Sequence, residues 1–135
     1  MEHMEQLKRI LEAHKELLLR VLIITREQPL LIEGDDIVAL MNCIEARQKV
    51  IDQIDEIRLP ETAAEQARVH FPKLVSEISQ LLTAIRQQDD ENGAAATNKL
   101  AELRKQLQAL HANKQATAYE GMPLSQGATY LDKKG

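Results

Sequence analysis

The sequence predicts an all-α protein, an elongated antiparallel bundle or coiled coil of three or four long helices with an irregular C-terminal tail. Apolar residues recur at alternating steps of three and four over most of the chain, which is the helical period. Aromatic residues form only 2% of the 135 residues, so aliphatic side chains must fill the core. Three of the five glycines and both tyrosines follow residue 118. We therefore expect a helical bundle domain over residues 1–118 and a flexible tail over residues 119–135.

The first helix is expected over residues 4–33. Pro29 lies inside this span and should kink the helix rather than end it, because the apolar pattern continues to Gly34. Gly34 suits the position after a helix, and Asp35 or Asp36 suits the N-cap of the next helix. The apolar stripe of this first helix is made by Met4, Leu7, Leu11, Leu18 and Val21.

The second helix is expected over residues 36–57. Arg47 occupies the one position of its stripe that is not apolar. Pro60 then interrupts the pattern and suits a turn or a first helical position, and the Ala-rich residues 61–70 could form a short helix. The predicted stripe of the second helix is Ile37, Leu40, Ile44, Ile51 and Ile54.

Pro72 is expected to start or to kink the third long helix, and two apolar runs follow this part of the chain. Eleven residues lead from Ile85 in the first run to Ala96 in the second, so the two runs do not share one heptad phase. Residues 88–93 between them include acidic residues and Gly93, which disfavour a helix. This stretch is therefore either a stutter in one helix or a turn between two. The first run is Ala67, Phe71, Leu74, Ile78, Leu81 and Ile85, and the second is Ala96, Leu100, Leu103, Leu107 and Leu110.

The four leucines of the second run, Leu100, Leu103, Leu107 and Leu110, are the candidate partner-binding residues, and we name them the leucine stripe. A continuous helix over residues 72–117 would be roughly 69 Å long, against roughly 45 Å and 33 Å for the first two helices. The shorter helices could not cover it along its whole length, which would leave the leucine stripe exposed to a partner. Burial in the protein's own core is an equal alternative, and self-association into a homodimer is another.

Composition and charge exclude several functional classes. The net charge of −4 and the pI of about 5.6 argue against nucleic-acid binding, which needs a basic face. The densest apolar run, residues 17–24, contains Arg20 and is far too short to insert across a membrane. Cys43 is the only cysteine, so no disulfide forms within the chain, which suits a reducing cytoplasm. We expect a cytoplasmic protein.

The sequence shows no catalytic, cofactor-binding or metal-binding set, and we predict a protein that is not an enzyme. Phosphate-binding loops, nucleophile elbows and zinc-protease motifs are absent. A di-iron bundle needs Glu-x-x-His pairs, and no histidine here follows an acidic residue by three positions. The remaining polar features have structural interpretations: His14 as a partly buried histidine, Cys43 as a small buried apolar residue, Arg47 as a side chain reaching the surface, and residues 89–91 as a solvated acidic face.

Four segments, taken in order, carry a family resemblance. An acidic turn leads into a regularly spaced helix in "EGDDIVALMNCIEARQKVIDQID" (33–55). An acidic-Asn stretch and a leucine-rich run follow in "QQDDENGAAATNKLAELRKQLQAL" (87–110), then a tyrosine in "AYEG" (118–121) and the ending "GATYLDKKG" (127–135). In this order the chain resembles the FlgN-type flagellar export chaperones, and it departs from them at Pro29 and in the proline-bounded segment 60–72.

The resemblance implies a bacterial chaperone that acts in flagellum biogenesis without hydrolysing ATP. It would hold hook-associated proteins, those of the hook-filament junction, in the cytoplasm before type III export. The C-terminal helical segments of these proteins would bind the leucine stripe. Docking to the flagellar export gate would fall to Tyr119, with Tyr130 and Asp132 as further candidates.

Two alternatives remain open at this point. One is a FliT-like export chaperone with another flagellar cargo, and the other is a dimeric structural or regulatory coiled-coil protein. The tail could also be an ordinary frayed terminus.

Overall fold

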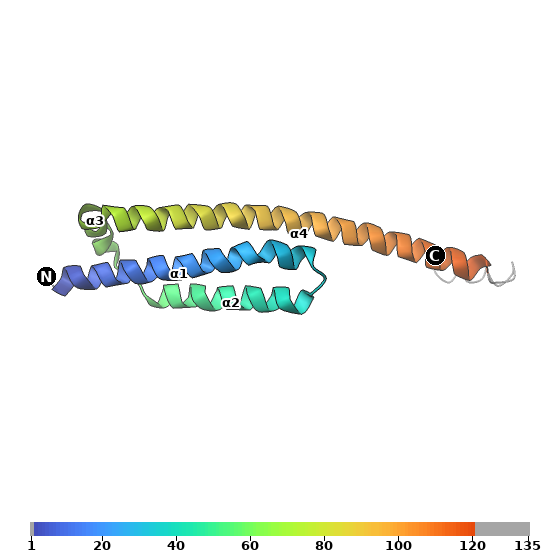
Figure 1. Cartoon of the computed structure of the whole chain (residues 1–135), viewed down its shortest axis with the longest axis horizontal. Coiled ribbons are helices and arrows are strands. Elements are labelled where there is room, and N and C mark those ends of the chain that lie inside the picture. Colours follow the sequence, from blue (N-terminus) through green and yellow to red (C-terminus); the bar gives the residue numbers. More distant parts are fainter. Residues whose placement is uncertain (1, 121–135) are drawn as a thin grey trace. The chain divides into compact units, whose positions relative to one another are not determined.

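Helices are the only regular secondary structure in the described part of the chain. The computed structural model describes the backbone of residues 2–120 and the side chains of residues 2–114. Within this part there are four helices and no strand, which confirms the predicted all-α class (Figure 1). The chain divides into two units, Met1–Ala96 and Thr97–Gly135, and each is described by itself. The helices are α1 (Glu2–Glu33), α2 (Ile37–Glu56), α3 (Glu61–His70) and α4 (Pro72–Glu120).

The helix boundaries follow the expected turn residues. α1 continues through Pro29, as predicted, and the Gly34 N–H donates to the Leu30 carbonyl over 3.0 Å. Asp36 is the N-cap of α2, where its carboxylate accepts from the Ala39 N–H at 3.0 Å. Such a cap satisfies a backbone donor that no residue inside the helix can reach.

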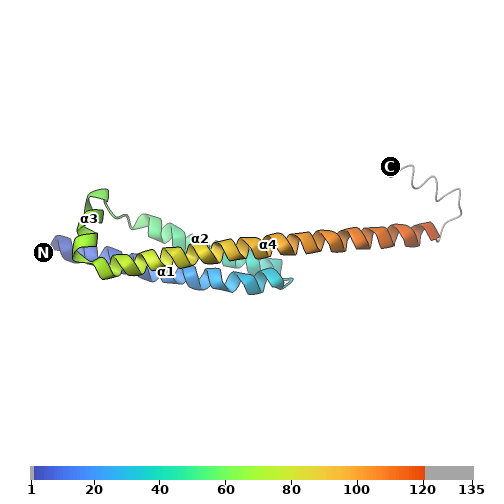
Figure 2. The same ribbon diagram turned by 90° about the horizontal axis from the view of Figure 1, so that it is seen from above.

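In the first unit α1 lies in the middle, with α2 on one side and residues 72–96 of α4 on the other (Figure 1). α2 runs antiparallel to α1 after the short turn, whereas residues 72–96 run in the direction of α1, as Figure 2 also shows. The central core joins all three helices. Its buried residues are Leu18, Val21, Leu22 and Ile85, and the half-buried residues around them are Val50, Ile51, Ile54, Ile78, Leu81 and Ala84.

A second core lies where α2 has ended and α3 packs against α1. Ala67 of α3 is only 1% exposed, because Leu7 and Leu11 of α1 cover it. The short helix expected over residues 61–70 is therefore confirmed, and it fills the place beside α1 that α2 leaves. The half-buried residues of this core are Met4, Leu59, Ala63, Phe71, Leu74, Val75 and Ile78.

The predicted stripe of α2 is partly wrong. Ile37 is 71% exposed and Ile44 is 51% exposed, whereas the neighbouring Cys43 is buried and its thiol donates to the Ile24 carbonyl at 3.6 Å. Neighbouring residues are about 100° apart around a helix, so Cys43 can face α1 while Ile44 is exposed. Apolar residues cover a wide arc of α2, and contact with α1 selects which part of the arc is buried.

Residues 88–93 continue the helix, so α4 is unbroken from Pro72 to Glu120. A Cβ atom added at Gly93 would meet no atom within 4 Å, so the surroundings leave room for a residue larger than glycine there. The alternating steps of three and four that lead through Leu81 and Ile85 reach Gln88 and Asn92 next. The core stripe therefore continues past Ile85, with polar residues in place of apolar ones.

Candidate functional site

The leucine stripe lies on the second unit and is exposed. Leu100 is 49% exposed, Leu103 40%, and Leu107 and Leu110 65% each. The steps between them are three, four and three residues, which places them along one face of α4. Every other side chain described in this unit, residues 97–114, is also exposed, apart from the half-buried Lys99.

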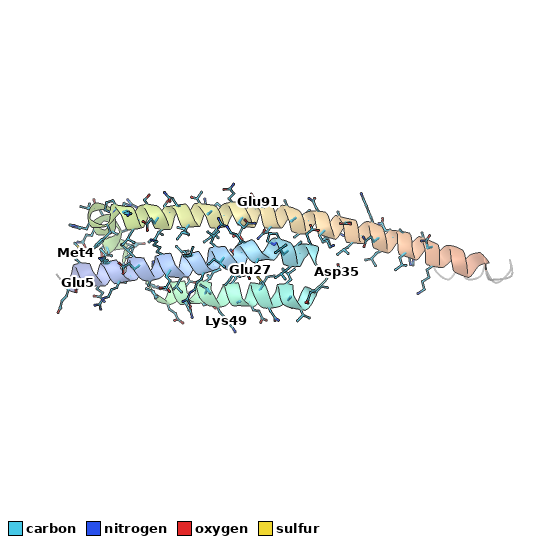
Figure 3. All side chains as sticks on the ribbon, viewed as in Figure 1. Met4, Glu5, Glu27, Asp35, Lys49 and Glu91 are labelled. Atoms are coloured by element: carbon cyan, nitrogen blue, oxygen red, sulfur yellow. The ribbon has the colours of Figure 1, made fainter. Side chains whose placement is uncertain are left out.

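This exposure leaves apolar surface in contact with water. Burying one leucine fully stabilises a protein by about 1.5–3 kcal/mol, so covering a half-exposed one contributes on the order of 1 kcal/mol. A helix packed along the leucine stripe would gain this for each of the four residues. A linear row on a helix suits a partner that is itself a helix. Side chains project from α4 along this part of the helix in Figure 3.

The predicted docking residues are only partly described. Tyr119 belongs to the last turn of α4, but its side chain lies outside the described residues. Tyr130 and Asp132 lie outside them altogether. The predicted tail, residues 119–135, therefore overlaps α4 only at its first two residues.

A buried polar cluster joins α1 to α4 in the first unit, and sequence reasoning missed it. Asn92 is 5% exposed, and its Nδ2 donates to the Thr25 carbonyl at 2.9 Å and to Gln28 Oε1 at 3.2 Å. Gln88 Nε2 donates to Asn92 Oδ1 at 2.9 Å. The signal was in the sequence, since Thr25 and Gln28 extend the stripe of α1 as Gln88 and Asn92 extend that of α4.

Pro29 explains why Asn92 is needed. In a regular helix the N–H of residue 29 would donate to the Thr25 carbonyl, four residues earlier, but proline has no N–H. A buried carbonyl without a donor is destabilising. Asn92 supplies that donor from α4, so a proline in one helix is matched by an asparagine 63 positions later in the chain.

Two ion pairs connect the helices of the first unit. Arg47 of α2 binds Asp89 of α4, with 2.7 Å between Nη2 and Oδ2. Lys15 of α1 pairs with Glu77 of α4, and the hydrogen bond and charge of Lys15 lower the pKa of Glu77 below its ordinary value. Arg47, predicted to reach the surface, is half-buried, and Asp89, predicted to be solvated, is its partner.

The other residues singled out in the sequence have structural surroundings. His14 is half-buried and its Nε2 donates to the Ile57 carbonyl, which ties the end of α2 to α1. Burial raises the pKa of the Cys43 thiol, and a thiol with a raised pKa is a weak nucleophile at neutral pH.

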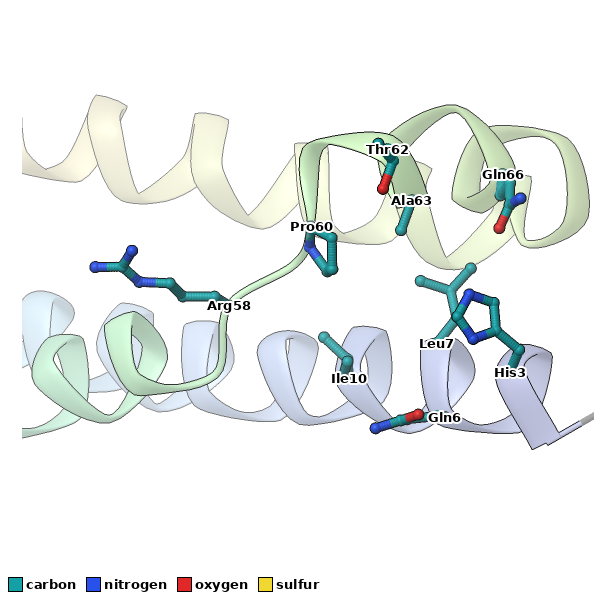
Figure 4. Close-up of a pocket in the computed structure, with 9 residues that line it drawn as sticks. All are labelled: His3, Gln6, Leu7, Ile10, Arg58, Pro60, Thr62, Ala63 and Gln66. Carbon is teal, nitrogen blue, oxygen red and sulfur yellow. The ribbon is translucent and has the colours of Figure 1, made fainter.

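A surface hollow of about 320 Å³ lies between the start of α1 and α3 (Figure 4). Its polar lining combines His3, Gln6 and Arg58 with Thr62 and Gln66, and Leu7 and Ala63 form part of its apolar lining. Among the residues that the structure describes, no three His, Cys, Asp or Glu side chains converge into a possible metal site. No helix within residues 2–120 has the length and apolar character needed to cross a bilayer.

Comparison of the chain with protein-family models, with curated proteins and with solved structures finds no match. Function is therefore inferred from the residues of the chain itself.

Proposed function

We propose that this protein is a non-enzymatic chaperone of helical protein segments, of the FlgN-like flagellar export type, and that the leucine stripe binds its cargo. The observation that carries the proposal is the exposure of four regularly spaced leucines on α4. The cargo is a hook-associated protein whose C-terminal segment folds as a helix along the leucine stripe. Binding takes place in the cytoplasm before type III export.

The energetics suit a carrier that must release its cargo. Covering the leucine stripe yields on the order of 4 kcal/mol in apolar burial. Association costs about 4–15 kcal/mol in lost translational and rotational freedom, and ordering of the partner adds to this cost. The four leucines alone therefore do not hold a partner, and the partner's own apolar residues and the contacts beside the leucine stripe decide how tight the complex becomes.

The test is cargo binding by a double variant, Leu103→Asp with Leu107→Asp, against a matched control, Ala112→Asp. Ala112 is exposed and lies on the opposite face of α4, so the control adds a carboxylate without touching the leucine stripe. We expect titration with the C-terminal segment of a hook-associated protein to show binding by the wild type and the control only. Circular dichroism should show nearly unchanged helicity in all three proteins. Retained binding by the double variant would overturn the proposal.

Docking to the export gate is proposed to use Tyr119, near the end of α4. A tyrosine ring is a common interface anchor, and losing one costs about 2 kcal/mol or more of binding. Tyr119→Ala should therefore weaken binding to the cytoplasmic domain of the gate and leave cargo binding intact. Paired titrations of this variant against both partners check the separation, and equal weakening of both would contradict it.

A homodimeric coiled coil is the second candidate function, since an exposed apolar stripe can also pair with its own copy. In that case the molecular mass would rise with protein concentration, and the double leucine variant would stay monomeric.

A further inference from the structure

The charged residues beside the leucine stripe all have the same sign. With Leu100 and Leu107 at heptad position a, and Leu103 and Leu110 at d, the flanking e and g positions follow from the sequence. Arg104 and His111 occupy e, while Lys99, Gln106 and Asn113 occupy g. Lys114 takes the next a position, at the end of the row. Both edges of the leucine stripe are therefore basic or neutral.

The one acidic residue of this segment is placed away from the stripe. Residues three or four positions apart are neighbours on a helix surface, and no leucine of the stripe stands three or four positions from Glu102. Glu102 therefore does not share their face. Lys105 lies on the far side of the helix. Although the whole chain carries a net charge of −4, the edge of the leucine stripe is thus a local basic surface.

Like charges disfavour a second copy as the occupant. In a parallel coiled coil, position g of one helix faces position e of the next heptad in its partner. That pairing would place Lys99 of one copy beside Arg104 of the other, and the next pairing would place Gln106 beside His111. Neither is attractive, and no register can bring together opposite charges at these edges, because none of the edge residues is acidic.

From this charge pattern we infer that the partner of the leucine stripe is an acidic amphipathic helix from another protein. Its apolar residues interlock with the four leucines, and its own edges carry Glu or Asp opposite Lys99 and Arg104. This inference rests on the proposed function, since it takes the leucine stripe to be a binding surface. The carboxylates select the partner and speed its encounter, while the leucines supply most of the contact area.

The form of the stripe favours a helix over a lipid surface. Helices that lie on membranes carry a broad apolar face, often with Trp or Phe at its edges. Here the row follows the narrow a/d pattern of a coiled coil, and residues 97–114 contain no aromatic residue.

Two three-heptad peptides test the inference on the full chain. Both have leucine at a and d; one carries Glu at every e and g position and the other carries Lys. We expect the acidic peptide to bind about tenfold more tightly at low salt, and added salt to reduce that difference. Arg104→Glu should narrow or reverse the preference, whereas Lys105→Glu, the same charge change on the far side of α4, should leave it nearly unchanged.

The outcomes separate this inference from the proposed function. Equal binding of both peptides, lost in the variant carrying Leu103→Asp and Leu107→Asp, would overturn the charge selection and leave the leucine stripe as a binding surface. Binding that survives those leucine changes, or no binding of either peptide, would overturn both. Tighter binding to vesicles containing phosphatidylserine than to the acidic peptide would replace the helix by a membrane surface. A mass that rises with concentration and is lost in the leucine variant would replace it by a second copy.

Discussion

The two parts of α4 carry the same kind of apolar spacing and have opposite exposure. In residues 72–96, Ile85 is 8% exposed and packs against α1. In residues 97–114, Leu107 is 65% exposed on a row with the same steps of three and four. Periodicity therefore identifies the apolar face of a helix, and the presence of a neighbouring element decides whether that face is buried.

The polar cluster marks the end of the buried part. Gln88 and Asn92 occupy positions of the α4 stripe that are apolar elsewhere in the helix. They bond to each other, and Asn92 also bonds to Thr25 and Gln28 of α1. Buried polar groups of this kind favour one register, because sliding one helix past the other would leave donors and acceptors unpaired. The leucine stripe has no such polar members.

The largest contrast is expected between Leu22→Ala and Leu107→Ala. Leu22 is 4% exposed in the central core, so its truncation should lower the free energy of unfolding by about 2–5 kcal/mol. The same change at Leu107 should alter it by no more than about 0.5 kcal/mol. Urea unfolding followed by circular dichroism measures both. Equal losses would mean that the leucine stripe is core.

Asn92→Ala should cost about 1–3 kcal/mol, because it leaves the buried Thr25 carbonyl without a donor. The loss should be smaller in the Pro29→Ala background, where residue 29 regains its N–H and can donate to the Thr25 carbonyl itself. Unfolding of the wild type, both single variants and the double variant gives the coupling free energy. If the two changes were simply additive, Asn92 would have no role in compensating Pro29.

The ion pair of Arg47 with Asp89 should contribute less, about 0.2–1 kcal/mol, because both side chains are partly exposed. A double-mutant cycle with Arg47→Met and Asp89→Asn isolates the contribution of the pair. It should shrink in 1 M salt, where charges are strongly screened. A coupling free energy unaffected by salt would point to packing of the Arg47 stem instead.

The smallest effect is expected at Lys15 and Glu77, and it depends on pH. The hydrogen bond from Lys15 lowers the folded-state pKa of Glu77 below its ordinary value of 4.5. The stabilisation is therefore present above pH 4.5 and is lost as the pH falls through the folded-state pKa. Thermal unfolding of Lys15→Met should show a lower midpoint than the wild type at neutral pH, and the gap should close in acid. A gap that is independent of pH would exclude this linkage.

The sequence by itself determined the helical class and several helix ends. Pro72, Gly34 and Asp36 act on their own backbone and on residues within one helical turn, so their effects can be derived without knowing the fold. The eleven-residue step between Ile85 and Ala96 was also visible, but it left open whether residues 88–93 are a stutter in one helix or a turn between two. Spacing alone also predicted that the four leucines of the leucine stripe form one row along the helix.

Only the tertiary structure decided which residues meet. Cys43 rather than Ile44 faces α1, because the orientation of α2 depends on how its whole surface fits its neighbour. The bond from Asn92 to Thr25 spans 67 positions of the chain, and no local rule links residues so far apart. Helical periodicity is a property of one segment, whereas burial is a property of two. This is why spacing predicted the row of leucines, while exposure and burial of that row remained equal alternatives until the structure was known.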